Sequence, residues 1–383
     1  MADYVSPWMD EELELFRDNV RKFIAREIKP HEERWADQQH VDRELWSKAG
    51  QAGLLGTDVP EEYGGAGGSF AHESVVYEEL AYAGNTSWAK AVHEIAAHYI
   101  VGCGTQEQKR DWLPRLVSGE LVGAIAMTEP GTGSDLQAVR TRAELRGDEY
   151  VVNGAKTFIS NGHVHDLLLI VCKTGKNEGA KGISLLLAET GKLEGYRRGR
   201  ILSKIGQKGQ DTSELFFEDM RVPAENLLGG REGQGFYQLM NQLPRERLMI
   251  AVGGIAAAEA ALRHTIEYCS ARQAFGQSVL SFQNTRFRLA ECKTEARIGR
   301  VFIDHCIAQL NRGELDAETA SMAKWWATQK QCEIVDACLQ FFGGYGYMLE
   351  YPIARLYADA RVQKIYGGSN EIMKELIARG LHA

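Results

Sequence analysis

A glycine-containing loop is the first stretch of the chain whose residue types could hold a small molecule. It reads GTGSDL over residues 131–136, and a ligand can approach its amides and hydroxyl groups closely because glycine has no side chain. Such a loop could hold a flavin ring or a phosphate by hydrogen bonds, or it could be only a turn. Leu136 stands where a dinucleotide fingerprint needs its third glycine, and no strand-to-helix crossover opens there, so we do not predict a Rossmann site.

Two histidine pairs could suggest a metal, but their spacing does not favour one. His93 and His98 are five positions apart, which places their rings about 140° apart around a helix, whereas the zinc-protease helix uses a spacing of four. We therefore expect both on a helical surface. His163 and His165 form an isolated H-x-H without further ligands at a recognisable spacing. The sequence predicts no metal site.

The elements before residue 122 are predicted to be helices. Apolar residues recur at a spacing of three and four from Trp8 to Ile28, and Pro30 ends that pattern. Further helices are expected at residues 44–55, 73–83, 86–101 and 106–116, with breaks between them that are rich in glycine or contain proline.

Short and often β-branched runs follow from about Val122. We expect strands at residues 141–145, 150–152, 157–159, 167–171, 183–187 and 214–217, with turns at Gly147-Asp148 and Asn153-Gly154. Because no long helices separate these runs, a parallel doubly wound sheet fits them poorly, and we predict an antiparallel β domain.

Long helices return after Gly235. We expect them at residues 236–272, 282–312 and 317–342, followed by a shorter pair at 352–366 and 370–379, and long helices joined by short turns favour an antiparallel bundle. The predicted fold class is therefore α+β and multidomain. We place an N-terminal α-helical domain at 1–121, a middle antiparallel β domain at 122–232 and a C-terminal helical bundle at 233–383.

Composition narrows the possible partners and location. The 383 residues carry 44 Lys and Arg against 52 Asp and Glu, a formal charge of −8, so the chain lacks the basic footprint of a nucleic-acid or anionic-lipid binder. The most apolar stretch, 249–262, is shorter than the roughly 20 residues of a spanning helix. The seven cysteines include no C-x-x-C pair. Together with an acidic start that lacks a signal-peptide pattern, they predict a cytoplasmic protein with buried free thiols.

Five motifs, in order along almost the whole chain, resemble those of the acyl-CoA dehydrogenases. They are MTEPGTGSD (127–135), NGAKTFISNG (153–162), RQAFG (272–276) with FQ (282–283), Gln340 with GGYGY (343–347), and RVQKIYGGSNEI (361–372). That family combines an N-terminal helical domain, a middle β domain and a C-terminal four-helix bundle, in agreement with the three regions above. The resemblance implies FAD as cofactor, bound between the β domain and the bundle.

The resemblance also implies which residues contact FAD. Thr128 and Ser160 would hydrogen-bond the edge of the flavin ring, and Phe158 would pack on the ring where many relatives have Trp, without the indole donor. Arg272, Phe275 and Gln283 would hold the diphosphate and adenosine half. The Arg272 guanidinium suits this role because its fork of N–H donors matches phosphate oxygens. The remaining cofactor-binding positions are Met127, Gly133, Ser134 and Ile159, with Gln340, Gly343 and Gly344 reaching from a neighbouring subunit and Ser369 and Glu371 closing the site.

The family's reaction needs a carboxylate base, because a proton leaves the carbon next to the thioester carbonyl while a hydride leaves the next carbon for the flavin. In many members this carboxylate follows the Tyr of the last motif, but here that position is Gly367. Either the chain is inactive or another base substitutes. The segment LPRERL (243–248) resembles the long-chain and isovaleryl subgroups, in which a glutamate of the first long C-terminal helix is the base. Glu246 takes that place.

Two alternatives stay open for Glu246. A glutamate beside two arginines could be a surface residue paired with them. If Glu246 is instead the base, burial would raise its pKa while Arg245 and Arg247, if close, would lower it, and the sequence does not decide which effect is larger.

By the same resemblance, Ser134 and Arg247 would contact the CoA portion of the substrate, and Tyr366, Gly367 and Gly368 would contact its thioester end. The Gly367 amide would donate to the enolate oxygen as it develops. We expect an FAD-dependent dehydrogenase that forms trans-2-enoyl-CoA from a medium-to-long or branched acyl-CoA in fatty-acid β-oxidation. The family implies a homotetramer and an electron-transferring flavoprotein as acceptor.

Three segments, 158–162, 210–219 and 370–379, look most like the long-chain subgroup. The nearest alternative is a branched-chain or terpenoid acyl-CoA dehydrogenase of the isovaleryl or citronellyl type. An oxidase that passes electrons to oxygen and a non-catalytic acyl-CoA-binding protein on the same fold are further alternatives.

Overall fold

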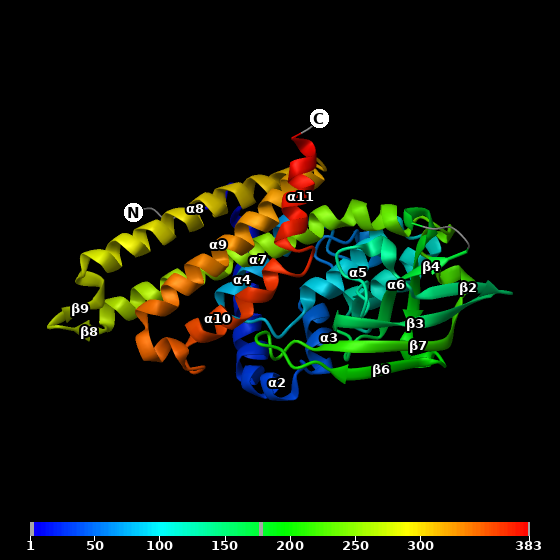
Figure 1. Ribbon diagram of the computed structural model, residues 1–383, viewed down its shortest axis with the longest axis horizontal. Coiled ribbons are helices and arrows are strands. Elements are labelled where there is room, and N and C mark those ends of the chain that lie inside the picture. The colour runs from blue at the N-terminus through cyan, green and yellow to red at the C-terminus, as the bar shows by residue number, and fades with distance from the viewer. Residues whose placement is uncertain (1–3, 176–178, 382–383) are drawn as a thin grey trace.

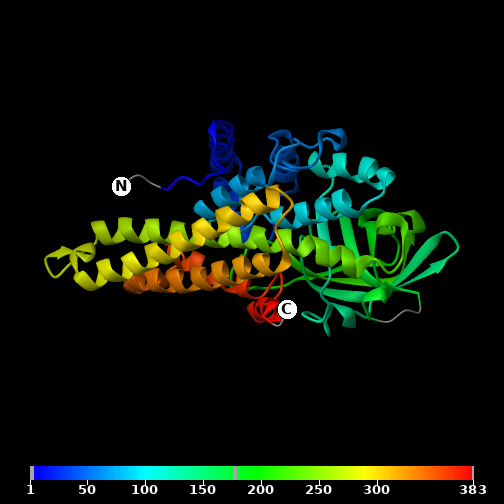
Figure 2. The same cartoon turned by 90° about the horizontal axis from the view of Figure 1, so that it is seen from above.

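The N-terminal helices pack beside the long C-terminal helices, with the sheet at one end of the molecule (Figures 1 and 2). The structure is a computed structural model that describes residues 4–175 and 179–381. Its first helices are α1 Glu11–Phe23, α2 Glu32–Gln38, α3 Arg43–Gln51, α4 Phe70–Tyr82, α5 Lys90–Cys103 and α6 Gln106–Val117. α1 begins where the Asp10 carboxylate accepts a hydrogen bond from the Leu13 amide at 2.9 Å, an N-cap. The helical prediction for this region is confirmed.

The middle of the chain forms one sheet of seven strands in the described residues. The strands are β1 Gly123–Ala126, β2 Arg142–Arg146, β3 Glu149–Ser160, β4 Leu167–Thr174, β5 Ile183–Glu189, β6 Tyr196–Ile201 and β7 Thr212–Pro223. Their order is β1-β4-β2-β3-β7-β6, with β5 paired to β4. The predicted antiparallel arrangement holds for most pairs, but β4 runs parallel to both β1 and β2, so the sheet is mixed.

Three details of the strand prediction need correction. Asn153-Gly154 is not a turn, because β3 runs through it with a register shift between Val152 and Gly154. Gly154 has φ +155°, and a Cβ there would lie 2.4 Å from the Thr141 hydroxyl, so the glycine allows two strands to approach closely. β1 and β6 were not predicted at all, since GAIA is short and small and YRRGRI is rich in arginine. The turn at Gly147-Asp148 is present.

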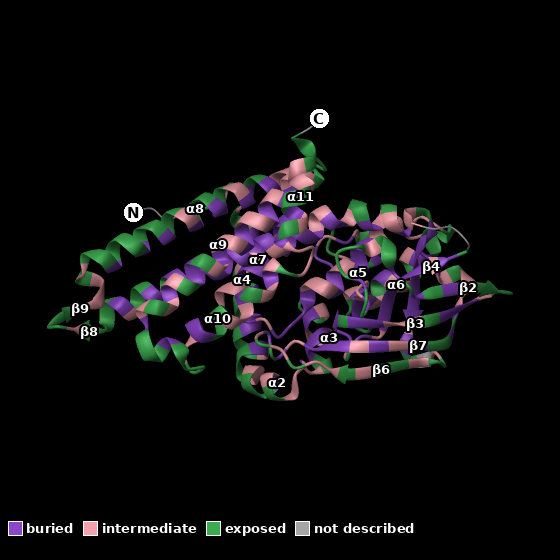
Figure 3. Ribbon diagram, viewed as in Figure 1, coloured by how far each residue is buried: buried purple, intermediate pink, exposed green. Residues whose placement is uncertain are grey.

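The C-terminal region consists of long helices and a short hairpin. The bounds are α7 Gly235–Ala271, β8 Gln273–Ala274, β9 Gln277–Ser278, α8 Gln283–Asn311, α9 Ala317–Phe341, α10 Pro352–Ala360 and α11 Asn370–Gly380. α7 runs from the sheet to the hairpin at the opposite end of the molecule (Figure 1). Burial is densest along the middle of α7 and in the sheet, whereas the β8–β9 hairpin is exposed (Figure 3).

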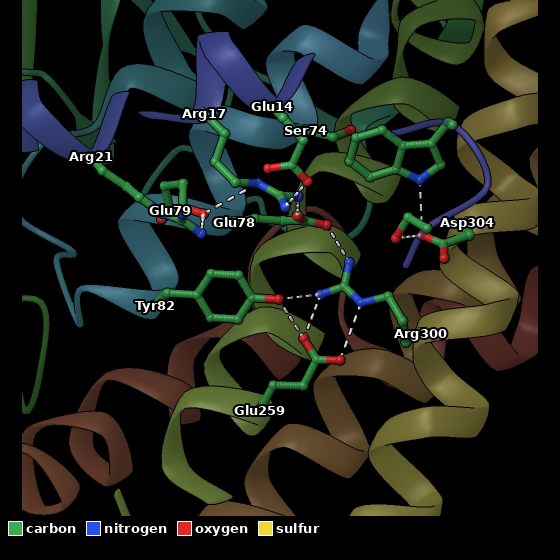
Figure 4. A network of polar contacts seen from close by, with 12 residues as sticks. Glu14, Arg17, Arg21, Ser74, Glu78, Glu79, Tyr82, Glu259, Arg300 and Asp304 are labelled. Carbon is green, nitrogen blue, oxygen red and sulfur yellow. Dashed lines mark hydrogen bonds and ion pairs between the residues drawn. The ribbon is translucent and has the colours of Figure 1, made fainter. Parts of the chain in front are cut away.

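A buried polar network ties the N-terminal helices to the bundle (Figure 4). The Arg300 guanidinium of α8 contacts the carboxylate of Glu78 on α4, and its Nη2 lies 2.7 Å from Oε2 of Glu259 on α7. The Tyr82 hydroxyl of α4 donates to the same Glu259 oxygen at 2.7 Å. Asp304, one turn along α8, accepts hydrogen bonds from three side chains of the N-terminal segment, Tyr4 at 2.7 Å, Ser6 at 3.0 Å and Trp8 at 2.9 Å.

Composition predicted buried free thiols, and it showed no apolar stretch long enough to span a membrane. All seven cysteines are free, five of them buried, while Cys103 and Cys332 are half-buried. Among the described residues, no helix has both the length and the apolar content to cross a membrane.

Candidate active site

Glu246 lies on the buried face of α7, near the end of the helix that meets the sheet. Its side chain is only 7% exposed, and the Tyr99 hydroxyl of α5 donates to its Oε1 at 2.9 Å. The flanking arginines point elsewhere: Arg245 pairs with Asp58, and Arg247 Nη1 lies 3.3 Å from the Ser321 hydroxyl. Glu246 is therefore not a surface residue paired with its arginine neighbours.

Burial dominates the electrostatics of Glu246. Loss of solvation raises the pKa of this carboxyl from 4.5 to about 7, while the Tyr99 hydrogen bond and the charge of Arg247 act in the opposite direction. Arg245 is ion-paired with Asp58 and is not among the groups that shift this pKa. A buried carboxylate with a pKa near neutrality can both hold and release a proton at physiological pH.

The loop that contains Gly367 lies against the same face of α7. Gly367 and Gly368 have φ values of +64° and +88°, which glycine adopts without strain. A Cβ at Gly367 would lie 2.3 Å from Cδ1 of Ile250, which is one helical turn beyond Glu246. The main chain of this loop therefore packs directly on α7 beside Glu246.

A buried lysine holds the glycine loop in place. Lys324 of α9 donates from Nζ to the Gly368 carbonyl at 2.7 Å and to Asn370 Oδ1 at 3.1 Å. Ser369 caps α11 by accepting from the Ile372 amide at 3.4 Å, and Glu371 is exposed in the first turn of that helix. Tyr366 is half-buried beside the loop. Lys324 was not among the predicted site residues, because a lysine within a helical pattern looks like a surface residue.

The β-domain residues gather at one end of β3. The Thr157 amide donates to the Thr128 carbonyl at 2.9 Å, which joins the segment after β1 to β3. Phe158 has φ +58° and is 67% exposed, between buried Thr157 and Ile159. The Ser160 hydroxyl accepts from Gln210 Nε2 at 3.2 Å. An aromatic side chain held outward at a strained φ, beside hydroxyl and amide groups, fits the face and the polar edge of a flavin ring.

The rest of the predicted loop is also accessible. Lys156 Nζ donates to the Met127 carbonyl at 3.0 Å, which fixes the start of the loop. Gly133 and Ser134 are exposed, and a Cβ at Gly133 would meet no atom within 4 Å. The loop folds back on itself between Glu129 and Thr132, whose backbones exchange hydrogen bonds of 2.9 and 3.0 Å, and it is open to a ligand at Gly133 and Ser134.

A second group of predicted cofactor residues lies at the opposite end of the molecule (Figure 1). Phe275, in the β8–β9 hairpin, is 97% exposed with φ +52°, and Arg272 lies 5.8 Å from the Tyr345 ring. Arg272, Gly343 and Gly344 line a surface cavity of about 410 Å³. Gln283 and Gln340 are exposed at the same end. One chain therefore does not bring this group together with Phe158 and Glu246. The resemblance had implied a neighbouring subunit only for Gln340, Gly343 and Gly344.

The expectation that His93 and His98 lie on a helical surface is wrong. His93 is 1% exposed and bridges the Leu116 carbonyl at 3.1 Å and the Gly123 amide at 3.0 Å. His98 Nε2 lies 2.9 Å from Asp58 Oδ1. The spacing rule gave their angle around the helix but not what covers each face. Within residues 4–175 and 179–381, no cluster of three or more His, Cys, Asp or Glu is arranged to hold a metal ion.

Comparisons with known proteins cover almost the whole chain. Residues 10–120, 124–220 and 233–382 match the profiles described as acyl-CoA dehydrogenase, N-terminal domain, middle domain and C-terminal domain. The long-chain specific acyl-CoA dehydrogenase, mitochondrial, of Mus musculus is 48% identical over 371 residues, 96% of this chain and 86% of that one.

Two solved structures share the fold. The acyl-CoA dehydrogenase from Geobacillus kaustophilus superimposes with a TM-score of 0.96 at 45% identity, covering 99% of this chain and 100% of that one. A glutaryl-CoA dehydrogenase from Mycobacterium smegmatis, solved in complex with FADH2, gives a TM-score of 0.90 at 28% identity over 97% and 95% of the two chains.

Proposed function

The chain belongs to the acyl-CoA dehydrogenase family, and on this premise we propose that Glu246 is the base of its reaction. The protein is an FAD-dependent oxidoreductase that dehydrogenates fatty acyl-CoA thioesters. When bound, FAD supplies the hydride acceptor. The observation that carries the proposal is a buried carboxylate with a pKa near 7 on the face of α7 where the glycine loop packs.

Glu246 would remove the proton from the carbon next to the thioester carbonyl. Gly367 has no side chain, so this position cannot supply the base, but its amide can donate to the oxygen that becomes negative. Lys324 supports that role because it holds the next carbonyl, that of Gly368. Glu246→Gln should keep bound FAD and bind acyl-CoA, but acyl-CoA should no longer bleach its flavin.

We assign Arg247 and Ser134 to the CoA portion of the substrate. Arg247 is 5% exposed, and its Nε is buried without a hydrogen-bond partner among the described residues. A buried donor of this kind fits an anionic or carbonyl acceptor on a ligand. Ser134 is exposed in the open loop, where its hydroxyl is accessible.

We propose that the functional unit is a homotetramer and that each FAD is bound by two copies of the chain. Thr128, Phe158 and Ser160 would hold the ring, and Arg272, Phe275 and Gln283 of another copy would hold the diphosphate and adenosine. Their position at opposite ends of one molecule supports this arrangement (Figure 1). Light scattering of the FAD-loaded protein tests it, because a monomer of 42.6 kDa that retains FAD would contradict shared binding.

We propose a medium-to-long or branched acyl-CoA as substrate, in fatty-acid β-oxidation, with an electron-transferring flavoprotein as acceptor. The identity with a relative named as long-chain specific supports the chain length. Anaerobic titration with a panel of acyl-CoAs identifies the chain that bleaches the flavin most rapidly. Hydrogen peroxide formed at a comparable rate without an acceptor protein would favour an oxidase instead.

We also propose a cytoplasmic location. The seven free cysteines support it, because thiols persist in a reducing compartment. Fractionation of cells followed by detection of the chain tests this proposal.

A further inference from the structure

Among the residues that the structure describes, Tyr99 is the one that donates a hydrogen bond to the Glu246 carboxylate. Its hydroxyl donates to Oε1 at 2.9 Å, and its side chain has 0% exposure on α5. The second oxygen, Oε2, has no hydrogen-bond donor among the residues that the structure describes. The two oxygens of the carboxylate are therefore in different environments.

We propose that Tyr99 is a positioning residue that holds Oε1 of Glu246 and so presents Oε2 to the substrate proton. This inference rests on the proposed role of Glu246 as the base. In the reaction the C–H bond next to the thioester carbonyl breaks and its proton bonds to Oε2. The electron pair left on that carbon would form the double bond, and FAD, when bound, would supply the acceptor that is reduced by the hydride of the next carbon.

The helices that carry the two residues are locked together beside this contact. His98, which precedes Tyr99, and Arg245, which precedes Glu246, both bind Asp58, with His98 Nε2 2.9 Å from Oδ1. One turn beyond Tyr99, a Cβ at Gly102 would lie 2.4 Å from Gln242 Nε2, so α5 and α7 approach closely there. The Tyr99 hydroxyl is therefore held at a fixed position relative to the carboxylate, as a positioning role requires.

The charges around the pair allow Tyr99 to remain a donor. Burial and the Glu246 carboxylate raise the pKa of Tyr99 well above its usual value, so the hydroxyl stays protonated across the working range of the base. The groups that act on the pair are Arg247 from α7 and Cys103 from α5, and Lys324 from α9 is close enough to Arg247 for their charges to interact. A hydroxyl that donates to a carboxylate favours its charged form, so loss of Tyr99 should make Glu246 harder to ionise.

Tyr99→Phe tests the proposal, with Tyr150→Phe as a matched control. The Tyr150 hydroxyl of β3 also donates to a glutamate, Glu232, at 2.8 Å, but Glu232 precedes α7 and neither residue contacts Glu246. In Tyr99→Phe we expect the acid limb of the kcat/KM profile to move up by about one pH unit. Anaerobic flavin reduction by acyl-CoA should slow by about tenfold or more. In Tyr150→Phe neither quantity should change.

The possible outcomes separate this inference from the proposed function. If Tyr99→Phe binds FAD normally and its pH profile and rate of flavin reduction match the control, Tyr99 does not position the base. Tyr99→Met lacks the donor as well and should repeat the shift if Tyr99→Phe folds poorly. If Glu246→Gln still bleaches its flavin with acyl-CoA at a near wild-type rate, the proposed base itself is wrong, whatever Tyr99→Phe does.

Discussion

Helix α7 carries two glutamates that receive the same kind of hydrogen bond in two different surroundings. Tyr99 of α5 donates to Glu246 at 2.9 Å, and Tyr82 of α4 donates to Glu259 at 2.7 Å. Glu259 also lies 2.7 Å from the Arg300 guanidinium (Figure 4). Glu246 accepts from Tyr99 but makes no ion pair among the described residues.

The difference is a direct ion pair, which Glu259 makes with Arg300 and which Glu246 makes with no described residue. A guanidinium that bridges carboxylates on two helices fixes those helices to one another, which suits a structural role. A neutral hydroxyl orients a carboxylate and leaves its protonation state free to change, which suits a base. The two sites therefore show how one helix can combine a structural and a catalytic carboxylate.

Loss of the Glu246 carboxylate should change turnover more than any other substitution. Glu246→Gln keeps the shape of the side chain but removes the proton acceptor, so flavin reduction by acyl-CoA should fall by about 10²- to 10⁴-fold. Glu259→Gln is the control, and its rate should stay within a few-fold of wild type while its stability falls. Anaerobic stopped-flow absorbance measures both. Equal loss in the two variants would contradict the division of roles.

The second prediction concerns stability at the structural site. Arg300 is 3% exposed, and Arg300→Met leaves Glu78 and Glu259 without their shared cation. Loss of one partner of a buried ion pair costs about 3 to 5 kcal/mol, and urea unfolding of the FAD-loaded protein measures it. Arg21→Met removes an arginine that is half-exposed and paired with Glu79, and should cost about 1 kcal/mol or less. Similar losses in both variants would show that the network does not act as a buried unit.

The third prediction concerns how the stability of the folded chain depends on the protonation of Glu246. The pKa of Glu246 is about 7 in the folded chain and 4.5 without burial. Below pH 4.5 the carboxyl is protonated in both states. Between 4.5 and 7 the unfolded chain loses its proton first, so stability falls as pH rises, and above 7 this group contributes no further change.

Urea unfolding at about pH 5 and about pH 8 measures this dependence. Wild type should lose up to about 3 kcal/mol more than Glu246→Gln between the two conditions. The same fall in the variant would assign the pH dependence to other groups.

The periodic parts of this architecture could be predicted from the sequence. The long C-terminal helices match the expected ranges within about two residues, because apolar residues recur along them at helical spacing. β6 was missed since Arg197, Arg198 and Arg200 are unusual in a strand, although they suit the exposed edge that β6 forms. The turn assigned to Asn153-Gly154 was wrong because the dipeptide rule does not register that Thr141 lies against Gly154.

Site residues could be predicted only where they belong to a sequence motif that resembles the family. Glu246 and Gly367 were found by resemblance, and the Gly367 loop packs against Ile250, one turn beyond Glu246 on α7. The Tyr99 contact joins residues 147 positions apart, and no local pattern marks it. Likewise, Phe158 and Phe275 lie far apart because α7 runs from the sheet to the β8–β9 hairpin. The order of motifs along the sequence does not show the direction of that helix.

Removal of the Tyr82 hydroxyl, which binds Glu259, should have the weakest effect of these substitutions. Tyr82→Phe removes one donor from Glu259, but Arg300 still binds that carboxylate through Nε at 3.2 Å and Nη2 at 2.7 Å. We therefore expect a loss of about 1 kcal/mol in urea unfolding and no shift in the pH profile of flavin reduction. Because Tyr99→Phe removes the same group from a glutamate that no arginine holds, its pH profile should move while that of Tyr82→Phe stays at the wild-type position. A shift in both variants, or in Tyr82→Phe alone, would mean that the guanidinium does not distinguish the two glutamates of α7.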